Sequence, residues 1–240
     1  MQNKRHIVVL TGAGISAESG LKTFRDAGGL WEGFRVEEVA SPEAFAANPE
    51  KVLAFYNQRR AQAREAAPNA AHTALVELEA GFQVDIVTQN VDDLHERAGS
   101  SHVLHLHGQL NLARSTKNAG MIQHVEADLN IGDLAPDGAQ LRPHIVWFGE
   151  PVPMIEMAAQ LVSQADMVLV IGTSLAVYPA AGLLDYTSIT TPIYVVDPNK
   201  PPLYTAQPIE FITAPASEGV PQLVQELLAG TDSLSQQTYP

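Results

Sequence analysis

The sequence predicts an α/β fold: a Rossmann-like, doubly wound parallel sheet with a smaller lobe formed by two insertions. The run Ile7–Thr11 is uncharged and rich in β-branched residues, which is typical of a strand covered on both faces. Similar runs recur at Val84–Thr88, Val103–Leu106, Met167–Ile171 and Ile193–Val196. Segments with helical spacing separate these runs, which places helices on both faces of a mostly parallel sheet.

Three of the intervening segments have the apolar spacing of helices. The segment Ala70–Leu78 follows Pro68-Asn69, and an asparagine suits the cap position there. The segments Pro153–Ala165 and Val220–Leu228 carry apolar stripes of their own. The end of the chain, Thr231–Pro240, is polar, and we expect a frayed tail at residues 231–240.

Two stretches do not follow the alternation of strand and helix. Residues 28–65 have no strand signal, and they contain Ser41-Pro42, a cap with proline in the first turn, followed by a charged helix around Asn48–Arg64. Residues 111–142 are rich in glycine, asparagine and aspartate. We therefore expect a main domain of residues 1–27, 66–110 and 143–230, with 28–65 and 111–142 forming a small lobe.

The composition excludes several classes of function. The chain has 240 residues, 14 Lys and Arg against 27 Asp and Glu, and a formal charge of −13, so nucleic acid is not the expected partner. It has no cysteine, which removes disulfides, thiol nucleophiles and cysteine-based zinc sites. The apolar run after Met1-Gln2-Asn3 is too short for a signal core or a membrane span, and we expect a cytoplasmic protein with no membrane partner.

A glycine-rich turn directly follows the first predicted strand. Gly12-Ala13-Gly14-Ile15-Ser16-Ala17 fits the dinucleotide fingerprint, in which Gly12 allows the tight turn and Gly14 lets the backbone approach a pyrophosphate. A plain turn is the alternative. A Rossmann dehydrogenase would present an acidic residue on a second strand about 20 residues later. The segment Gly29–Phe34 offers no such strand, so the sequence predicts nucleotide binding without hydride transfer.

Motifs along the chain resemble those of the sirtuins, the NAD-dependent protein deacylases. They fall in the family's order and span about Ile7 to Ala216. They are the run Gly12–Gly20 with Thr23-Phe24-Arg25, then Thr88-Gln89-Asn90-Val91-Asp92-Asp93-Leu94-His95, His105-Leu106-His107-Gly108, Val146-Trp147-Phe148-Gly149-Glu150 and Gly172-Thr173-Ser174. The resemblance implies that the main domain binds NAD as a co-substrate.

The resemblance implies a nicotinamide side of the NAD site. Asn90 would position the nicotinamide ribose and a water, and Asp92 would accept a hydrogen bond from the nicotinamide carboxamide. Phe24 would stack near the reactive sugar carbon, while Arg25 would steady the mobile loop. The other residues implied on this side are Gly12, Ala13, Gly14, Ile15, Trp31, Gln89 and Val91. From spacing alone, Asn90 or Asp92 could instead only cap the helix that follows.

The same resemblance implies an adenosine side. Gly172, Thr173 and Ser174 follow a predicted strand, so their N–H and hydroxyl groups would hold phosphate or ribose, although a plain turn is the alternative. Asp197-Pro198-Asn199 follow another strand, and either Asp197 or Asn199 would contact the adenosine ribose. Ala216 would border the adenine.

His107 is the candidate general base, because the resemblance assigns it to the family's catalytic histidine and imidazole accepts a hydroxyl proton near neutral pH. Out of context, a histidine here is more often structural. His102, His105 and His107 could also indicate a metal, but no cysteine or nearby carboxylate completes a tetrahedral set.

Tyr56 and Arg59 are three residues apart on one helical face, and with Arg60 and Arg64 they ordinarily indicate a solvated basic face. However, Tyr-x-x-Arg at this place resembles the signature of sirtuins that remove succinyl and malonyl groups, since a guanidinium and a phenol can bind a terminal carboxylate. The resemblance also implies that an acyl-lysine peptide pairs near Val146, Phe148 and Gly149, with Trp147 beside the lysine tunnel.

Most sirtuins carry zinc cysteines in the region that corresponds to Asn111–Arg142, and this chain has none, so we expect no zinc. Apolar residues would replace the metal by packing on the helix around Asn48–Arg64; they are Leu112, Met121, Ile122, Val125, Leu129, Ile131 and Leu134. The implied reaction removes acyl groups from lysine and releases nicotinamide and O-acyl-ADP-ribose. The alternatives are ADP-ribosyl transfer or NAD hydrolysis in the same pocket, and an NAD-sensing module.

Overall fold

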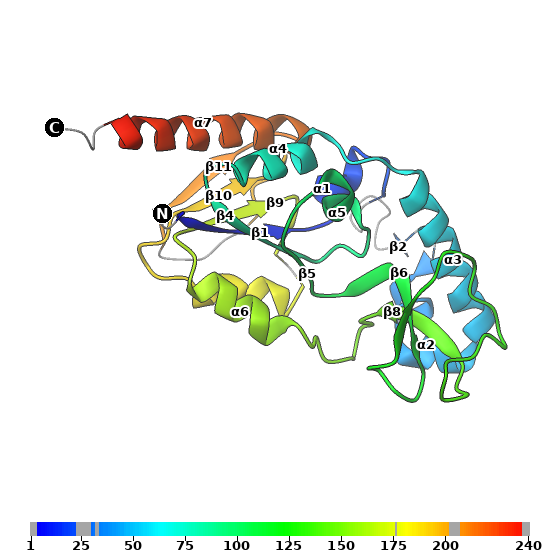
Figure 1. The fold of residues 1–240 in the computed structure, drawn as a ribbon. Helices are drawn as coiled ribbons and strands as arrows, with labels where there is room; N and C mark the ends of the chain where they lie inside the picture. The colour runs from blue at the N-terminus through cyan, green and yellow to red at the C-terminus, as the bar shows by residue number, and fades with distance from the viewer. Residues whose placement is uncertain (1–3, 23–29, 32–33, 176, 202–206, 237–240) are drawn as a thin grey trace.

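The computed structural model describes residues 4–22, 30–31, 34–175, 177–201 and 207–236. The main body is a parallel sheet with the strand order β11-β10-β9-β1-β4-β5 (Figure 1). Its strands are β1 (His6–Thr11), β4 (Gln83–Thr88), β5 (Val103–His105), β9 (Met167–Ile171), β10 (Ile193–Val196) and β11 (Ile209–Ile212). The chain runs outward from β1 on one side and returns to build the other side, so the predicted doubly wound fold is confirmed.

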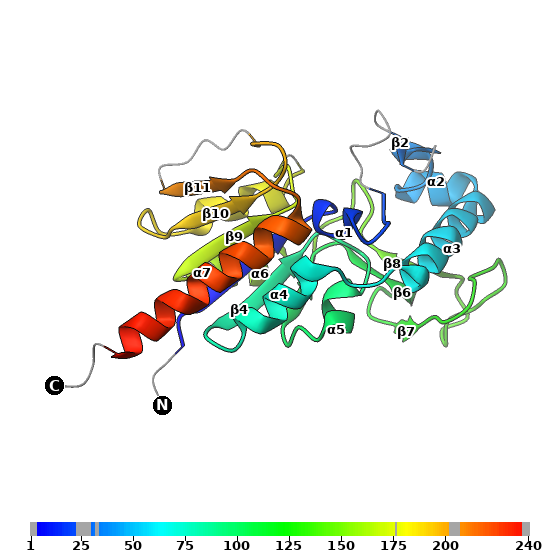
Figure 2. The same cartoon turned by 90° about the horizontal axis from the view of Figure 1, so that it is seen from above.

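Helices cover both faces of this sheet. On one face lie α4 (Ala70–Leu78) and α7 (Ala216–Gln236), and on the other lie α6 (Ile155–Ser163) and the 3₁₀ helix η2 (Ala180–Tyr186) (Figures 1 and 2). Two short helices, α1 (Gly14–Ala17) and α5 (Leu94–Ala98), follow β1 and β4. Both are near the edge of the sheet at which the parallel strands end.

The central strand supplies the core of both layers. Ile7 and Val9 pack toward α4 and α7, while Val8 and Leu10 pack toward α6 and η2. All four side chains are at most 2% exposed. Successive strand residues point to opposite faces, so an uninterrupted apolar run is what a strand covered on both sides requires.

The small lobe contains α2 (Pro42–Ala47), α3 (Pro49–Glu65) and an antiparallel sheet of order β7-β6-β8 (Figure 2). The sheet is formed by β6 (Gly108–Ser115), β7 (Ile122–His124) and β8 (Leu141–Ile145), and α3 packs on β6 and β8. The short strands β2 (Leu30–Trp31) and β3 (Phe34–Arg35) and the 3₁₀ helix η1 (Val36–Glu38) precede α2.

The structure differs from the sequence prediction in several elements. The strand β6 begins at Gly108 and β8 ends at Ile145, slightly outside the predicted insertion, and β2 and β3 lie where no strand was expected. The division into domains itself stays a prediction. The helix α7 continues to Gln236, so residues 231–236 are helical where a tail was predicted. Polar residues do not prevent a helix that is already formed and packed from propagating.

In the part of the chain that the structure describes, no helix combines the length and the apolar character needed to cross a membrane.

Candidate active site

The candidate site lies at the carboxyl edge of the parallel sheet, beside the central strand. The chain passes from β1 to β4 and β5 on one side and to β9 and β10 on the other. The strand order therefore reverses next to β1, and ligands of doubly wound folds bind outside the strand ends at such a reversal. The loops that follow β1 and β9 meet at this point.

These two loops pack backbone against backbone. The Gly12 N–H donates to the Ile171 carbonyl at 3.1 Å, and the Gly14 N–H donates to the Gly172 carbonyl at 2.8 Å. A Cβ on Gly14 would lie 2.6 Å from the Cα of Gly172, and Gly172 has a φ of +60°. Only glycine fits without a clash or strain at these places. The packing of one loop on the other is thus a second reason for the glycines, which the sequence analysis did not identify.

Ser16 joins the first loop to Asn90 and Asp92. Asn90 Nδ2 donates to the Gly12 carbonyl at 3.1 Å and to Ser16 Oγ at 3.2 Å. Ser16 also hydrogen-bonds the carboxyl group of Asp92. No role for Ser16 was predicted from the sequence. Its position inside the Gly12–Gly20 motif was the one indication that it belongs to the site.

Asp92 is buried, and the pKa of its carboxyl group is raised. Burial raises the pKa of its carboxyl group above the usual value, and hydrogen bonds from Leu94 N and from Ser16 oppose this shift. Its Oδ1 accepts from the N–H of Leu94, the first residue of α5, at 3.2 Å, while the N-cap residue of that helix is Asp93. Asp92 therefore contacts the first turn of α5 through its side chain and also lies at the loop cluster with Ser16.

His107 lies between β5 and β6, and one of its ring nitrogens is engaged. Nδ1 is 3.0 Å from the carbonyl oxygen of Gln89. A carbonyl can only accept, so Nδ1 carries the proton and Nε2 keeps its lone pair. Burial lowers the pKa of His107 below its ordinary value of 6.5, against the opposing effect of this hydrogen bond. The ring is therefore neutral at neutral pH, with Nε2 able to accept a proton.

Gln89 connects His107 to the late nucleotide loop, because its side-chain Nε2 donates to Thr173 Oγ1 at 3.0 Å. His105 has a different environment: its Nδ1 lies 3.1 Å from the Asn90 carbonyl and its Nε2 lies 2.7 Å from Glu96 Oε1. Both of its ring nitrogens are used to hold neighbouring elements together. The structural interpretation therefore suits His105.

The residues expected on the adenosine side follow β9 and β10. Thr173 is buried and Ser174 is half-buried. Asp197 is 5% exposed, and its Oδ1 accepts from Asn199 N at 2.8 Å, while Pro198 and Asn199 are exposed. The alternative between Asp197 and Asn199 stays open. Ala216 is buried at the start of α7.

Some expected residues fall outside the part that the structure describes. Phe24 and Arg25 are not among the described residues. Trp31 is placed only as backbone in β2, so its side chain is not described. Ala13 is half-buried, Ile15 is fully buried at the start of α1, and Val91 is half-buried beside the small lobe.

Tyr56 and Arg59 lie on α3 and are buried, with exposed fractions of 0% and 6%. Arg60 is only 2% exposed, so a solvated basic face, the ordinary interpretation, is wrong for Arg59 and Arg60 and holds only for the exposed Arg64. The Tyr56 hydroxyl accepts from Trp147 Nε1 at 2.9 Å. Burial raises the pKa of Tyr56 well above its usual value, while Arg142 and Arg59 lower it, so the phenol stays neutral.

The segment after β8 links the two lobes through its backbone. Val146 N donates to the His107 carbonyl at 2.9 Å, and Phe148 N donates to the Ala40 carbonyl at 3.0 Å. The Phe148 ring is 51% exposed. Gly149 is exposed and has a φ of +90°. Trp147 is only 2% exposed and packs in the core of the small lobe. Its expected place beside the lysine tunnel stays a prediction.

Among the described residues there is no group of three or more histidine, aspartate or glutamate side chains that could hold a metal ion. The helix α3 is joined to the rest of the small lobe by hydrogen bonds to the backbone of Leu129 and Leu110. The Asn57 amide donates to the Leu129 carbonyl and accepts from Leu129 N, both at 2.9 Å, and Arg60 Nε donates to the Leu110 carbonyl at 2.7 Å.

The predicted apolar contacts of the small lobe are only partly correct. Leu129 and Val125 join a cluster with Leu53, and Leu112 and Met121 are half-buried. Three other predicted core residues are instead 46–57% exposed: Ile122, Ile131 and Leu134. The residues that complete the cluster are smaller or belong to other elements, namely Phe45, Ala113, Ala135 and Leu141. Spacing alone could not distinguish these, because the turns around 116–140 do not follow a helical or strand period.

The fold and the site together define a nucleotide-binding α/β enzyme with a candidate histidine base. Comparison with known proteins identifies the class: a family model described as the Sir2 family matches residues 12–179. The chain is 54% identical over 224 residues to an NAD-dependent protein deacylase of Helicobacter pylori, covering 93% of this chain and 96% of the relative. It is 51% identical over 230 residues to an NAD-dependent protein deacylase of Bacteroides thetaiotaomicron, covering 93% and 98%.

Solved structures agree with these relatives. A Sir2 homologue in complex with ADP-ribose superposes with a TM-score of 0.85 at 39% identity, covering 99% of this chain and 96% of the other. A complex of a Sir2 homologue with NAD gives a TM-score of 0.83 at 40% identity, covering 95% and 91%. The chain belongs to the Sir2 family, and it is an NAD-dependent protein deacylase.

Proposed function

We propose that the chain removes succinyl and malonyl groups, and also acetyl groups, from protein lysines, and releases nicotinamide and O-acyl-ADP-ribose. The observation that carries this proposal is the neutral His107, held through Nδ1 by Gln89, next to the cluster of Ser16, Asn90 and Asp92. The buried pair Tyr56 and Arg59 supports the acyl preference.

The side chains at the sheet edge fit NAD by their chemistry. The buried carboxyl of Asp92 can accept from a carboxamide, and the buried Asp197 directly follows β10, where an acidic residue suits a ribose diol. The hydroxyls of Thr173 and Ser174 can donate to phosphate or ribose oxygens. NAD, when bound, supplies a ribose carbon that loses nicotinamide when the acyl oxygen of the modified lysine attacks it. Asn90 would hold the adjoining ribose and a water.

In this reaction His107 acts as the base. Its Nε2 accepts the proton of a ribose hydroxyl, while the Gln89 carbonyl keeps Nδ1 protonated and so fixes the tautomer. Because burial disfavours the imidazolium, the ring is ready to accept a proton at neutral pH. The backbone hydrogen bond from Val146 N to the His107 carbonyl ties this residue to the segment after β8, where the acyl-lysine peptide would pair.

The acyl group would end at α3. A buried guanidinium can form charge-assisted hydrogen bonds with a carboxylate, and a phenol that keeps its proton can donate to a carboxylate oxygen. A succinyl or malonyl group brings such a carboxylate to Arg59 and Tyr56, whereas an acetyl group does not. Peptide complexes among the solved relatives support a protein substrate, since one contains a deacetylated peptide with 3′-O-acetyl ADP-ribose.

The proposal is tested by comparing the wild type with His107→Ala on a succinyl-lysine peptide in the presence of NAD. Loss of the base should lower turnover by about 10²–10⁴-fold, with the melting temperature unchanged. Wild-type turnover should also fall as the pH drops through the lowered pKa of His107, which lies below 6.5. Full activity of His107→Ala would contradict the assignment.

A further inference from the structure

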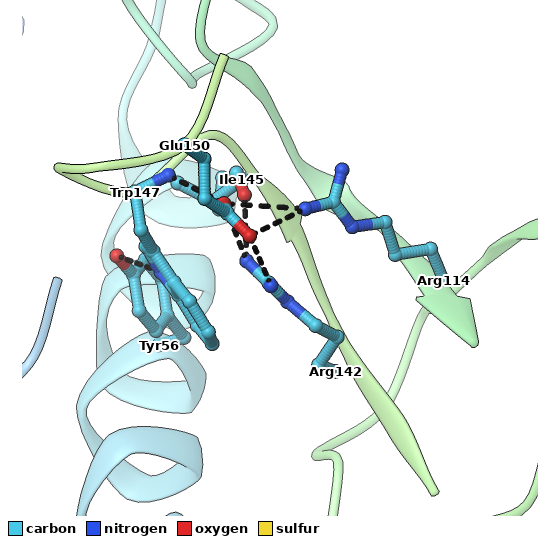
Figure 3. Close-up of polar contacts among 6 residues, drawn as sticks. All are labelled: Tyr56, Arg114, Arg142, Ile145, Trp147 and Glu150. Carbon is cyan, nitrogen blue, oxygen red and sulfur yellow. Dashed lines mark hydrogen bonds and ion pairs between the residues drawn. The ribbon is translucent and has the colours of Figure 1, made fainter. Parts of the chain in front are cut away.

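A largely buried ion cluster contacts Trp147, whose indole in turn contacts Tyr56. The Glu150 carboxylate accepts from Arg142 Nη1 at 2.6 Å and Nη2 at 3.0 Å, and from Arg114 Nη2 at 3.2 Å on both oxygens (Figure 3). It also accepts from Trp147 N at 2.8 Å. The side chains of Arg142, Arg114 and Glu150 are 9%, 12% and 18% exposed.

This cluster touches the Trp147 ring as well as its backbone. The guanidinium carbon of Arg142 lies 3.3 Å from the centroid of the indole, and Arg142 Nη2 also donates to the Ile145 carbonyl at 2.9 Å. Its hydrogen bonds to Glu150 and Ile145 therefore hold the Arg142 guanidinium over the ring. The Trp147 Nε1 donates in turn to Tyr56 Oη at 2.9 Å (Figure 3). A continuous path of contacts runs from Glu150 through Arg142 and Trp147 to Tyr56.

The contact with Trp147 determines which hydrogen bond the Tyr56 hydroxyl accepts and leaves its proton to donate elsewhere. An indole N–H can only donate, so the Tyr56 oxygen accepts from Trp147, and the phenol proton must point toward some other acceptor. This arrangement favours a hydrogen-bond acceptor, such as a carboxylate oxygen, near Tyr56.

A merely structural role would not need these charges. Desolvating two guanidinium groups and a carboxylate is costly, and apolar side chains of similar size usually hold a strand equally well. The surrounding core is indeed apolar and aromatic, with Phe45 at 5.3 Å from the Trp147 ring.

We propose that Arg142 and Glu150 are positioning residues that fix Trp147, and through it the Tyr56 hydroxyl, so that the acyl pocket accepts a carboxylate. The inference rests on the proposed function, since it assumes that Tyr56 and Arg59 meet the acid group of the acyl chain. It adds Arg142 and Glu150, which lie outside the Tyr-x-x-Arg pair, to the residues that determine acyl selectivity.

The test measures kcat and KM on two peptides of identical sequence, one with succinyl-lysine and one with acetyl-lysine, at saturating NAD. Arg142→Met keeps the length of the side chain but removes the charge and the planar stack. It should lower the succinyl-to-acetyl ratio of kcat/KM by about tenfold, mainly through a higher KM for the succinyl peptide. Trp147→Phe keeps an aromatic ring but removes the N–H donor, and it should lower the ratio in the same direction.

Arg114→Met is the matched control. It removes the other guanidinium from Glu150 and leaves the stack of Arg142 on Trp147 in place, so the ratio should stay within about twofold of the wild type. If Arg142→Met does not fold, Trp147→Phe and the isosteric Glu150→Gln decide the question. Equal losses on both peptides, or an unchanged ratio in Arg142→Met and Trp147→Phe, would overturn the inference.

Failure of the proposed function would look different. In that case the wild type would not act on the succinyl peptide, or Arg59→Met would leave the succinyl-to-acetyl ratio unchanged. A wild type and an Arg59→Met variant that behave as proposed, combined with cluster variants that keep the ratio, would reject the positioning role alone.

Discussion

Burial determines what Arg59 can do. An exposed arginine on α3 would contribute little more than solubility, because water screens its charge. At 6% exposure its guanidinium has lost most of its hydration, and an acyl carboxylate that reaches it gains a charge-assisted hydrogen bond. The sequence placed Tyr56 and Arg59 on one face of the helix but could not show this burial, because the covering groups come from β6, β8 and the segment after β8.

Arg59→Met should therefore lower kcat/KM for a succinyl-lysine peptide by at least about tenfold more than for the matching acetyl-lysine peptide. The reason is that only the succinyl group carries a carboxylate. Steady-state kinetics on the two peptides measure the ratio. Arg64→Met, an exposed arginine in the last turn of the same helix, serves as the control and should keep the wild-type ratio. Equal losses on the two peptides would make Arg59 a structural residue.

A pair of buried histidines affects stability rather than catalysis. The rings of His72 and His95 are 4.9 Å apart and at most 1% exposed. Burial lowers the pKa of His72 to about 4 and that of His95 to about 3. The unfolded chain therefore binds more protons than the folded chain below about pH 6.5, so stability is lost as the pH falls.

We expect each of these histidines to lower the free energy of unfolding by about 2 kcal/mol when the pH falls from 7 to 5. Urea denaturation of the wild type and of His72→Gln at both pH values measures this. Between pH 7 and pH 5 the variant should lose about 2 kcal/mol less unfolding free energy than the wild type, whatever its stability at pH 7. The same loss in both proteins would show that His72 is not a source of the acid sensitivity.

Helices and strands whose apolar residues follow a single regular spacing were predicted well from the sequence. The strands β9 and β10 and the helix α4 have the bounds that the sequence indicated, because each is covered on a known face and ends at a turn. The strands β6, β7 and β8 were missed, since apolar and polar residues in Gly108–Ser115 do not alternate cleanly and the register shifts between Gly108 and Ala113. Their pairing depends on partners distant in the sequence.

The helix α3 also stabilises the small lobe through Asn57. Its amide makes two hydrogen bonds with the backbone of Leu129, each at 2.9 Å. Asn57→Ala should lower the unfolding free energy by about 1–3 kcal/mol, because both backbone groups lose a partner. The exposed neighbour Gln58→Ala should change it by less than about 0.5 kcal/mol. Thermal or urea unfolding checks both, and equal effects would contradict the assignment.

For the whole molecule, the arrangement of motifs was predictable and the contacts between them were not. The order of the motifs along the chain identified the loops after β1, β4 and β9. However, the contacts of Ser16 with Asn90 and Asp92 join α1 to the end of β4, and only the assembled sheet brings them together. The Arg142–Glu150 cluster is likewise formed by two residues that neither a period nor a motif pairs.

A lobe held by hydrogen bonds and apolar packing should not depend on a metal. We expect no stoichiometric zinc by elemental analysis, and an unchanged melting temperature and activity after prolonged chelation. A structural zinc would contribute folding free energy directly, and its removal would unfold the lobe. One zinc per chain, or unfolding by the chelator, would show that histidine and carboxylate ligands hold a metal.

We infer that the chain transfers the acyl group of a succinylated lysine to ADP-ribose. Mass spectrometry of one reaction mixture, containing the chain, NAD and a succinyl-lysine peptide, follows every product at once. The account predicts equal amounts of unmodified lysine peptide, nicotinamide and O-succinyl-ADP-ribose, all lost in His107→Ala. ADP-ribosylated protein, or free ADP-ribose with the succinyl peptide intact, would contradict it and favour transfer or hydrolysis of NAD.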